Sequence, residues 1–132
     1  MFNVVVQQAI YDKLTADLAV PVYDDVPQSI DSGLSSDFPY ITIGEDSFTY
    51  LDTDDTNRVS VSIAVHVWSR YQGRSEVKAI QDQIFNSLHR ATLAAAGYKF
   101  ITITQSSASS FLDNDGQTRH GVQDFYLILE EL

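Results

Sequence analysis

The stretch VSVSIAVHVWSRYQGRSEV, from Val59 to Val77, contains a change of periodicity that decides the fold. Apolar side chains first recur at every second residue, which is typical of a β-strand with one buried face. A serine, an arginine and a glycine follow, and from Val77 onward the apolar residues recur at helical spacing. The sequence therefore predicts a long strand, a tight corner and an amphipathic helix, in that order.

The two faces of the predicted strand differ in chemistry. The core face carries Val59, Val61, Ile63, Val65 and Val67, and the opposite face carries Ser60, Ser62, Ala64, His66 and Trp68. A tryptophan in this setting either packs within its own chain or anchors a contact with another subunit. Arg70 also has two interpretations, as a salt bridge to acidic loops or as a clamp at an interface.

The residues before this stretch predict a helix, a loop and a strand. Asn3 is expected to cap the helix, whose apolar stripe is Val6, Ile10, Leu14 and Leu18. The segment Pro21–Pro39 is rich in Pro, Ser, Asp and Gly and is expected to be mainly loop, with a short strand around Val22–Tyr23. The β-branched segment Tyr40–Gly44 predicts a strand, and Asp52–Asn57 predicts the turn that follows it.

The residues after the stretch predict a second helix and two more strands. Ser75 is the expected cap of this helix, with Glu76 in its first turn, His89 and Arg90 in its last, and Gly97 after it. The strands are Tyr98–Gln105 and Thr118–Leu129, with a turn at Asp113–Gly116 between them. Ser106–Ser110 is either a flexible connection or an irregular edge strand. Val122 has the wrong parity for the core face, so we expect a bulge or a strand covered on both faces.

This order of elements predicts an α+β fold, a mainly antiparallel sheet with two helices packed on one face. The chain of 132 residues contains no repeat or low-complexity linker, so residues 1–132 are expected to form a single domain. The net charge of −10 argues against gripping a phosphate backbone. No signal peptide or membrane-spanning run is recognised, so we expect a soluble protein with no membrane partner.

The residues that carry chemistry do not form a recognisable site. There is no cysteine, and the three histidines, His66, His89 and His120, lack a predictable third ligand, although His66 and His120 would approach if their strands pair. The DNDG turn lacks the ligands of a calcium loop, and the acidic run at Asp52–Asp55 is typical of a solvated loop. No nucleophile elbow or phosphate-binding loop is present. We therefore expect no metal, no cofactor and no catalysis.

The order of several short motifs resembles a known family. These are VYDDVPQS at Val22–Ser29, the strand motif Pro-Tyr-Ile-x-Ile-Gly at Pro39–Gly44, the acidic loop, Val-Trp-Ser-Arg at Val67–Arg70 with Gly73 and Glu76 after it, and DGQTRHGVQDF at Asp115–Phe125. Together they are similar to the tail-completion or tail-terminator proteins of long-tailed phages, prophages and gene transfer agents. The resemblance covers most of the chain.

The resemblance implies a tail-terminator-like α+β subunit located in the virion, at the head-proximal end of the tail. Its implied partners are further copies of itself in a ring of six, the major tail tube protein and the head-tail connector, with DNA passing through unbound. The acidic composition is compatible with that passage. Cyclic assembly needs two different patches on each subunit. We expect the contact surface among His66, Trp68, Ser69, Arg70, Tyr71, Asp52, Asp54 and Asp55. The alternatives are a neck or head-completion protein and, in another class, a monomeric small-ligand-binding domain.

Overall fold

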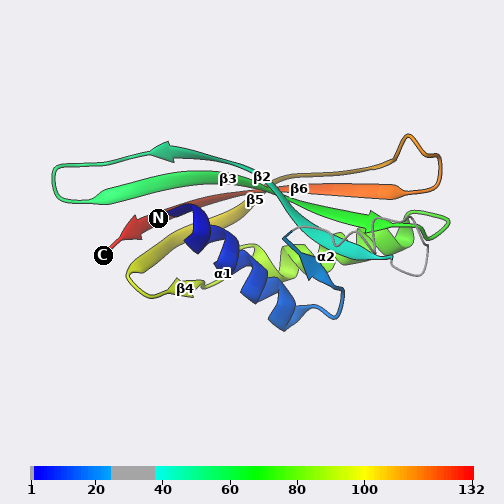
Figure 1. Cartoon of the computed structure of the whole chain (residues 1–132), viewed down its shortest axis with the longest axis horizontal. Coiled ribbons are helices and arrows are strands. Elements are labelled where there is room, and N and C mark those ends of the chain that lie inside the picture. Colours follow the sequence, from blue (N-terminus) through cyan, green and yellow to red (C-terminus); the bar gives the residue numbers. More distant parts are fainter. Residues whose placement is uncertain (1, 25–37) are drawn as a thin grey trace.

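The strand predicted around Val59–Val67 is β3 (Asn57–Ser69), an inner strand of a six-stranded sheet (Figure 1). The computed structural model describes residues 2–24 and 38–132. The strands lie in the order β1-β2-β3-β6-β5-β4. Only β1 and β2 are parallel, and all other neighbours are antiparallel. The α+β class and the mainly antiparallel sheet are confirmed.

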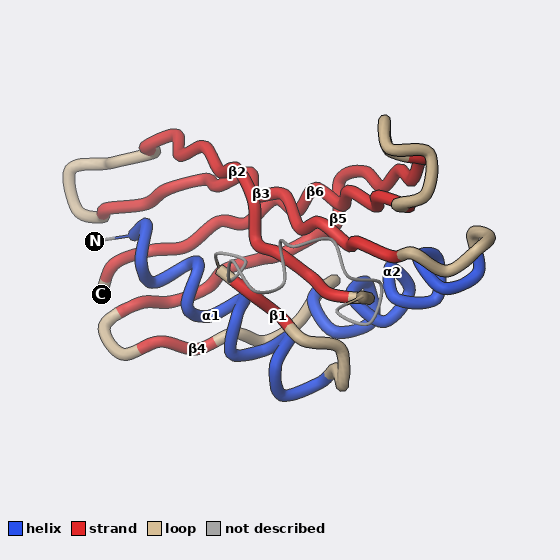
Figure 2. Tube along the Cα trace, turned by 45° about the vertical axis from the view of Figure 1, so that its right-hand side comes forward, coloured by secondary structure: helices blue, strands red, loops and turns tan. Residues whose placement is uncertain are grey.

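The remaining elements have the following bounds: α1 (Phe2–Asp17), β1 (Val22–Tyr23), β2 (Tyr40–Tyr50), α2 (Ser75–Leu88), β4 (Ala94–Ala95), β5 (Tyr98–Leu112) and β6 (Arg119–Glu131). Both helices lie on the same face of the sheet, as Figure 2 shows from a second direction. The predicted position of the helices is therefore confirmed.

The core lies between this face and the two helices. The odd-numbered apolar residues of β3 are buried, and so are Phe125, Leu127 and Leu129 of β6, which are its cross-strand neighbours. The helices contribute the predicted stripes, Val6, Ile10 and Leu14 from α1 and Val77, Ile80, Ile84 and Leu88 from α2. Each such side chain contributes about 1.5–3 kcal/mol when it is fully buried.

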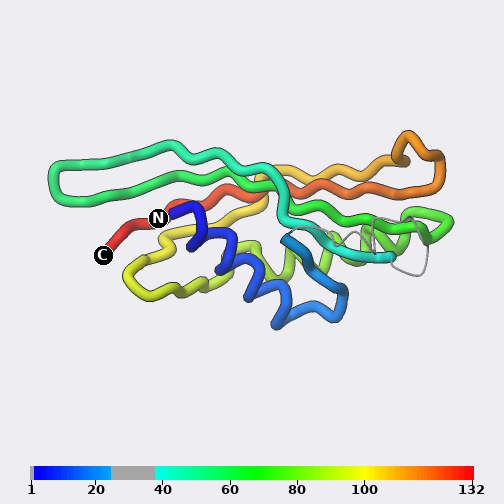
Figure 3. The backbone as a smooth tube through the Cα atoms, in the orientation of Figure 1, coloured from blue at the N-terminus to red at the C-terminus, as the bar shows by residue number. Residues whose placement is uncertain are grey.

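The opposite face of the sheet, called here the open face, has no helix over it in the described part of the chain (Figure 1). The β2–β3 hairpin reaches one end of the sheet and the β5–β6 hairpin reaches the other (Figure 3). Both ends of the described chain lie near the tip of the first hairpin (Figure 1). There the Phe2 ring lies 5.6 Å from that of Tyr98, and the Leu132 amide donates a 2.9 Å hydrogen bond to the Gly97 carbonyl.

Two of the strands, β2 and β5, are much longer than predicted. β2 continues past Gly44 because a bulge between Ile43 and Asp46 lets its pairing with β3 resume. β5 includes Ser106–Ser110, which pairs with β6 on one side only, so the interpretation of this segment as an irregular edge strand is correct. Most of the predicted loop Pro21–Pro39 lies outside the described residues, whereas the short strand Val22–Tyr23 is confirmed.

The predicted caps of both helices are wrong. α1 already includes Phe2, whose ring packs on Tyr98, so Asn3 lies inside the first turn. Arg74 occupies the cap position of α2, and no side chain caps the helix there. α2 ends at Leu88, so His89 and Arg90 follow the helix; the imidazole of His89 instead accepts a hydrogen bond from the Gln105 amide.

Gly97 does not end a helical region. It lies in the turn between β4 and β5 with a φ of +84°, a left-handed conformation that glycine adopts without a steric cost.

β6 has no bulge against β3, so the first of the two explanations offered for Val122 is wrong. Every residue of β6 from Arg119 to Glu131 pairs with one residue of β3. The core face of β6 continues through Gln123 and Gly121, which are buried, while Val122 lies on the open face. A polar residue at a core position caused the apparent break in parity. The Gln123 amide nitrogen donates to the Gln81 carbonyl and to the Gln105 side chain.

Candidate interaction surface

Four rings lie side by side on the open face, at the end of the sheet next to the β5–β6 hairpin. We call them the aromatic row: Tyr40, Trp68, His120 and Phe111, one from each of four neighbouring strands. The Trp68 and His120 rings are stacked with centroids 3.8 Å apart, and the Trp68 indole donates a 3.0 Å hydrogen bond to the Thr42 hydroxyl. The row forms because directly paired residues of antiparallel strands point to the same face.

His66 lies beside the row and connects it to a carboxylate. Its Nδ1 atom is 2.7 Å from Nε2 of His120, so one ring donates and the other accepts, and its Nε2 atom is 3.0 Å from the Glu45 carboxylate. Burial lowers the pKa of His120, and the neighbouring His66 lowers it further. The hydrogen bond from His66 lowers the pKa of Glu45. The expected approach of His66 and His120 is therefore confirmed.

Gly44 makes room for the His66 ring. A Cβ atom at this position would lie 2.4 Å from Nε2 of His66. No heavy atom approaches that closely in a relaxed structure, so any larger residue would displace the ring. The glycine of the Pro-Tyr-Ile-x-Ile-Gly motif thus has a local physical role.

Arg70 is bound within its own chain. Its Nε atom donates to the Thr118 hydroxyl at 3.2 Å, its Nη2 atom lies 3.7 Å from the Asp115 carboxylate, and its guanidinium lies over the Phe38 ring. The Thr118 hydroxyl and the backbone amides of Gln117 and Thr118 lower the pKa of Asp115 to about 2. Of the two interpretations of Arg70, the structure shows the salt bridge.

Ser69 is fully buried and builds the corner between β3 and α2. Its hydroxyl donates a 2.6 Å hydrogen bond to the Glu76 carboxylate and accepts one from the Tyr71 amide. Tyr71 itself is 54% exposed. Of the predicted contact residues in this region, Tyr71 is therefore accessible to another chain, whereas Ser69 is buried and stabilises the corner.

The predicted contact residues fall into two groups. His66, Trp68, Ser69, Arg70 and Tyr71 lie at or near the end of β3 that pairs with Tyr40. Asp52, Asp54 and Asp55 lie in the β2–β3 turn, next to the Tyr50–Val59 pair at the opposite end of the sheet (Figure 3). The structure does not bring the two groups together within one subunit.

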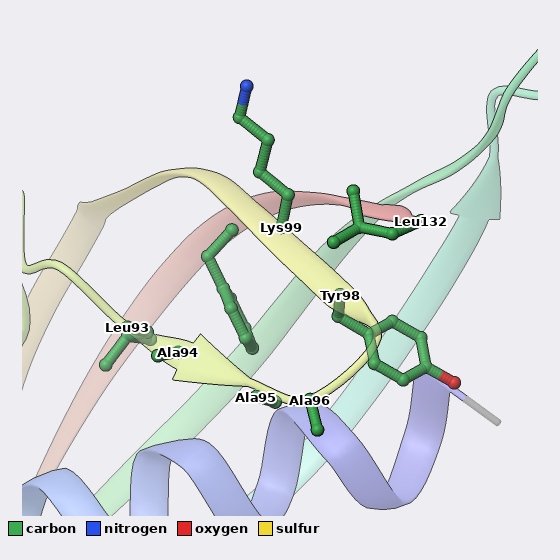
Figure 4. A pocket seen from close by; sticks show the side chains of 8 residues that line it. Leu93, Ala94, Ala95, Ala96, Tyr98, Lys99 and Leu132 are labelled. Carbon is green, nitrogen blue, oxygen red and sulfur yellow. The ribbon is translucent and has the colours of Figure 1, made fainter.

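No enclosed chemical site is evident among the described residues. One broad hollow lies at the β4–β5 turn, is shallow, and is lined largely by Ala and Leu side chains. Figure 4 shows Lys99 and Tyr98 projecting to opposite sides of β5 there. No group of three His, Asp or Glu side chains within the described ranges has the geometry of a metal site. No helix in those ranges is long and apolar enough to cross a membrane.

Several residues of this surface were not identified from the sequence. Tyr40, Thr42 and Phe111 belong to the aromatic row or contact it, and they become visible only after the strands are paired. Arg74 and Arg119 border a small hollow beside Phe111 and Leu112 at the same end of the sheet. The distribution of charge in the sequence could have indicated this end. It contains four of the eight basic residues, Arg70, Arg74, Lys78 and Arg119.

The described part of the chain is thus a sheet covered by helices on one face, with an aromatic and basic end and an acidic end. A family model described as tail completion protein gp17 matches residues 8–130. The tail completion protein gp17 of Bacillus phage SPP1 is 28% identical over 103 residues, covering 77% of this chain and 76% of that protein. A chain from the virion of a native gene transfer agent particle has the same fold, with a TM-score of 0.82, 19% identity and coverage of 95% and 94%.

The chain belongs to the tail completion protein gp17 family. It is a structural protein of the virion tail, which confirms the family resemblance found in the sequence.

Proposed function

We propose that this protein forms a ring, of six subunits, at the head-proximal end of the tail tube. There it ends tube polymerisation and presents a surface to the head-tail connector. The observation that carries the proposal is the family match over residues 8–130, nearly the whole chain. The net charge of −10 supports a channel that DNA crosses without specific binding, because like charges repel over a Debye length of about 8 Å.

Phage that lack this protein are expected to make tails of uncontrolled length, well beyond the normal value, because nothing stops addition of tube subunits. Electron microscopy of tails made with and without the protein measures this directly. Normal-length tails that fail to join heads would contradict termination and favour the neck or head-completion role. Pull-downs against the tail tube protein and the connector protein provide the matching biochemical comparison.

The aromatic row is proposed to lie at or near a subunit boundary. Trp68→Ala is expected to weaken ring formation more than tenfold, because a central aromatic anchor carries much of the energy of a protein contact. Its effect on the melting temperature of the subunit should be smaller, since Trp68 lies on the open face and outside the core. Sedimentation measures the first quantity and thermal unfolding the second.

Tyr126→Ala is the matched control for Trp68→Ala, since Tyr126 is an aromatic residue of the same face but lies farther along β6, opposite Ser62 and away from the row. It should leave the oligomer unchanged. An unaltered oligomer in Trp68→Ala would remove the row from the contact. A wild-type chain that remains monomeric under all conditions tested would favour the monomeric binding domain.

A further inference from the structure

Each edge of the sheet is formed by a two-residue strand, β1 or β4, that covers only part of the longer strand next to it. The rest of that longer strand is paired on its inner side only. At one edge, β1 pairs only with Ile41 and Thr42, so among the described residues no strand pairs with the outer side of Glu45–Tyr50, called here the β2 edge. On the other side, β4 pairs only with Tyr98 and Lys99, which leaves the β5 edge, Gln105–Leu112. Most residues of both edges are exposed. Free edges are templates for pairing with another chain.

We propose that the β2 edge of one subunit adds to the β5 edge of the next, so that the sheet continues from copy to copy. This inference rests on the proposed ring and specifies its contact. β2 and β5 run in opposite directions within the sheet, so copies placed side by side in the same orientation pair antiparallel. The two edges belong to opposite ends of the subunit (Figure 1). Successive copies must therefore be staggered, as closed sheets require.

The charges at the two edges favour a contact between different edges. The β2 edge begins with Glu45 and Asp46, both exposed, and is followed by the acidic turn. The β5 edge ends at the hollow bordered by Arg74 and Arg119. Antiparallel addition places the carboxylates at this basic end. Two β2 edges would instead bring like charges together, so the pattern disfavours the symmetric dimer and favours the head-to-tail contact that a ring needs.

Two side chains, one from α2 and one from the residue after it, bond to the backbone of the β5 edge, and most of the edge stays available for pairing with another strand. Gln81 donates a hydrogen bond to the Ser109 carbonyl, and His89 accepts one from the Gln105 amide. No other bond from the helix region to the backbone of Gln105–Leu112 is seen within residues 2–24 and 38–132. An incoming strand must displace the flexible Gln81 side chain from Ser109, in the middle of the edge. The bond to His89 lies at the end of the edge, on Gln105.

Cysteine cross-linking tests the pairing, because the chain has no native cysteine. Ser47 and Ser109 both lie on the open face and are exposed, and both are central in their edges. In the S47C/S109C variant, antiparallel pairing brings the two Cα atoms to about 4.5–5.5 Å, within reach of a disulfide. Mild oxidation of the purified chain should give a ladder of covalent oligomers on a denaturing gel. S47C/S107C tests a register shifted by two residues.

The control pair is S62C/S109C. Ser62 is an exposed serine of the same face but lies on the inner strand β3, directly opposite Ser47, where a neighbouring β5 edge cannot pair with it. We expect at least about fivefold more cross-linked product from S47C/S109C or S47C/S107C than from S62C/S109C, because disulfide geometry is restrictive. Equal yields, or a chain that sediments only as a monomer, would overturn the edge contact.

A charge exchange provides a second measurement. D46K and R74E should each weaken association roughly 3- to 10-fold, and D46K/R74E should recover most of that loss, because the new lysine and glutamate attract each other. Additive losses in the double variant would overturn the charge argument. Tail length is an independent readout: normal termination together with failed cross-linking rejects the edge contact and leaves the proposed function standing.

Discussion

Replacing Phe125 with alanine is expected to lower the free energy of unfolding by about 3–5 kcal/mol. Phe125 has no exposed surface and is the largest of the fully buried side chains. It lies on β6 opposite Ile63 of β3, in the middle of the face that the helices cover. Its removal loses transfer free energy and leaves a cavity that rigid strands cannot close. Denaturant unfolding followed by circular dichroism measures the change.

Tyr126→Ala is the matched control, since Tyr126 is the next residue of the same strand but points to the open face and is 37% exposed. Its removal should cost less than about 1 kcal/mol, in the range usual for surface substitutions. Equal costs at the two positions would mean that the core does not lie on the face with the helices, and would contradict the strand register.

Gly44→Ala is expected to cost about 1–3 kcal/mol, the range usual for overpacking a well-filled site. The added Cβ atom would lie 2.4 Å from Nε2 of His66, so the ring must move. That movement disturbs the hydrogen bonds of His66 to both His120 and Glu45. Chemical denaturation of the variant measures the loss.

The His66→Ala background isolates the cause of this loss. Without the imidazole, the alanine at position 44 meets no close side chain, and it carries a smaller conformational-entropy cost in a strand than glycine does. Gly44→Ala should therefore be neutral or slightly stabilising in that background. A loss of the same size with and without His66 would show that the backbone at the bulge, and not the ring, requires glycine.

The core could be predicted from the sequence because one face of β3 is buried along nearly its whole length. Alternation then identifies the core residues directly. The same alternation includes Ser69, which continues the odd series after Val67, so its burial was predictable from parity alone. The pattern failed at Gln123, because the groups that accept hydrogen bonds from its amide nitrogen, on Gln81 and Gln105, come from α2 and β5. Periodicity within one segment carries no information about such partners.

The proposed contact surface was only partly predictable. The sequence identified His66 and Trp68 as unusual residues on the half-polar face, but the stacking of Trp68 on His120 depends on the register of β3 against β6. It also grouped Trp68 with the aspartates of the β2–β3 turn. A strand of 13 residues separates them, about 40 Å at the usual rise, so the two groups can meet only between different subunits.

The adjacency of Phe2 and Leu132 has a practical consequence for imaging. Phe2 and Leu132 both lie at the end of the sheet next to the β2–β3 turn, since the Phe2 ring is 6.4 Å from that of Tyr50 and the Leu132 amide donates to the Gly97 carbonyl. A small fluorescent or density label attached at either residue therefore marks the same end of the subunit and leaves the aromatic row unobstructed. In micrographs of whole tails, the radius and height of that label would report which end of the subunit points toward the capsid and which lies nearer the channel.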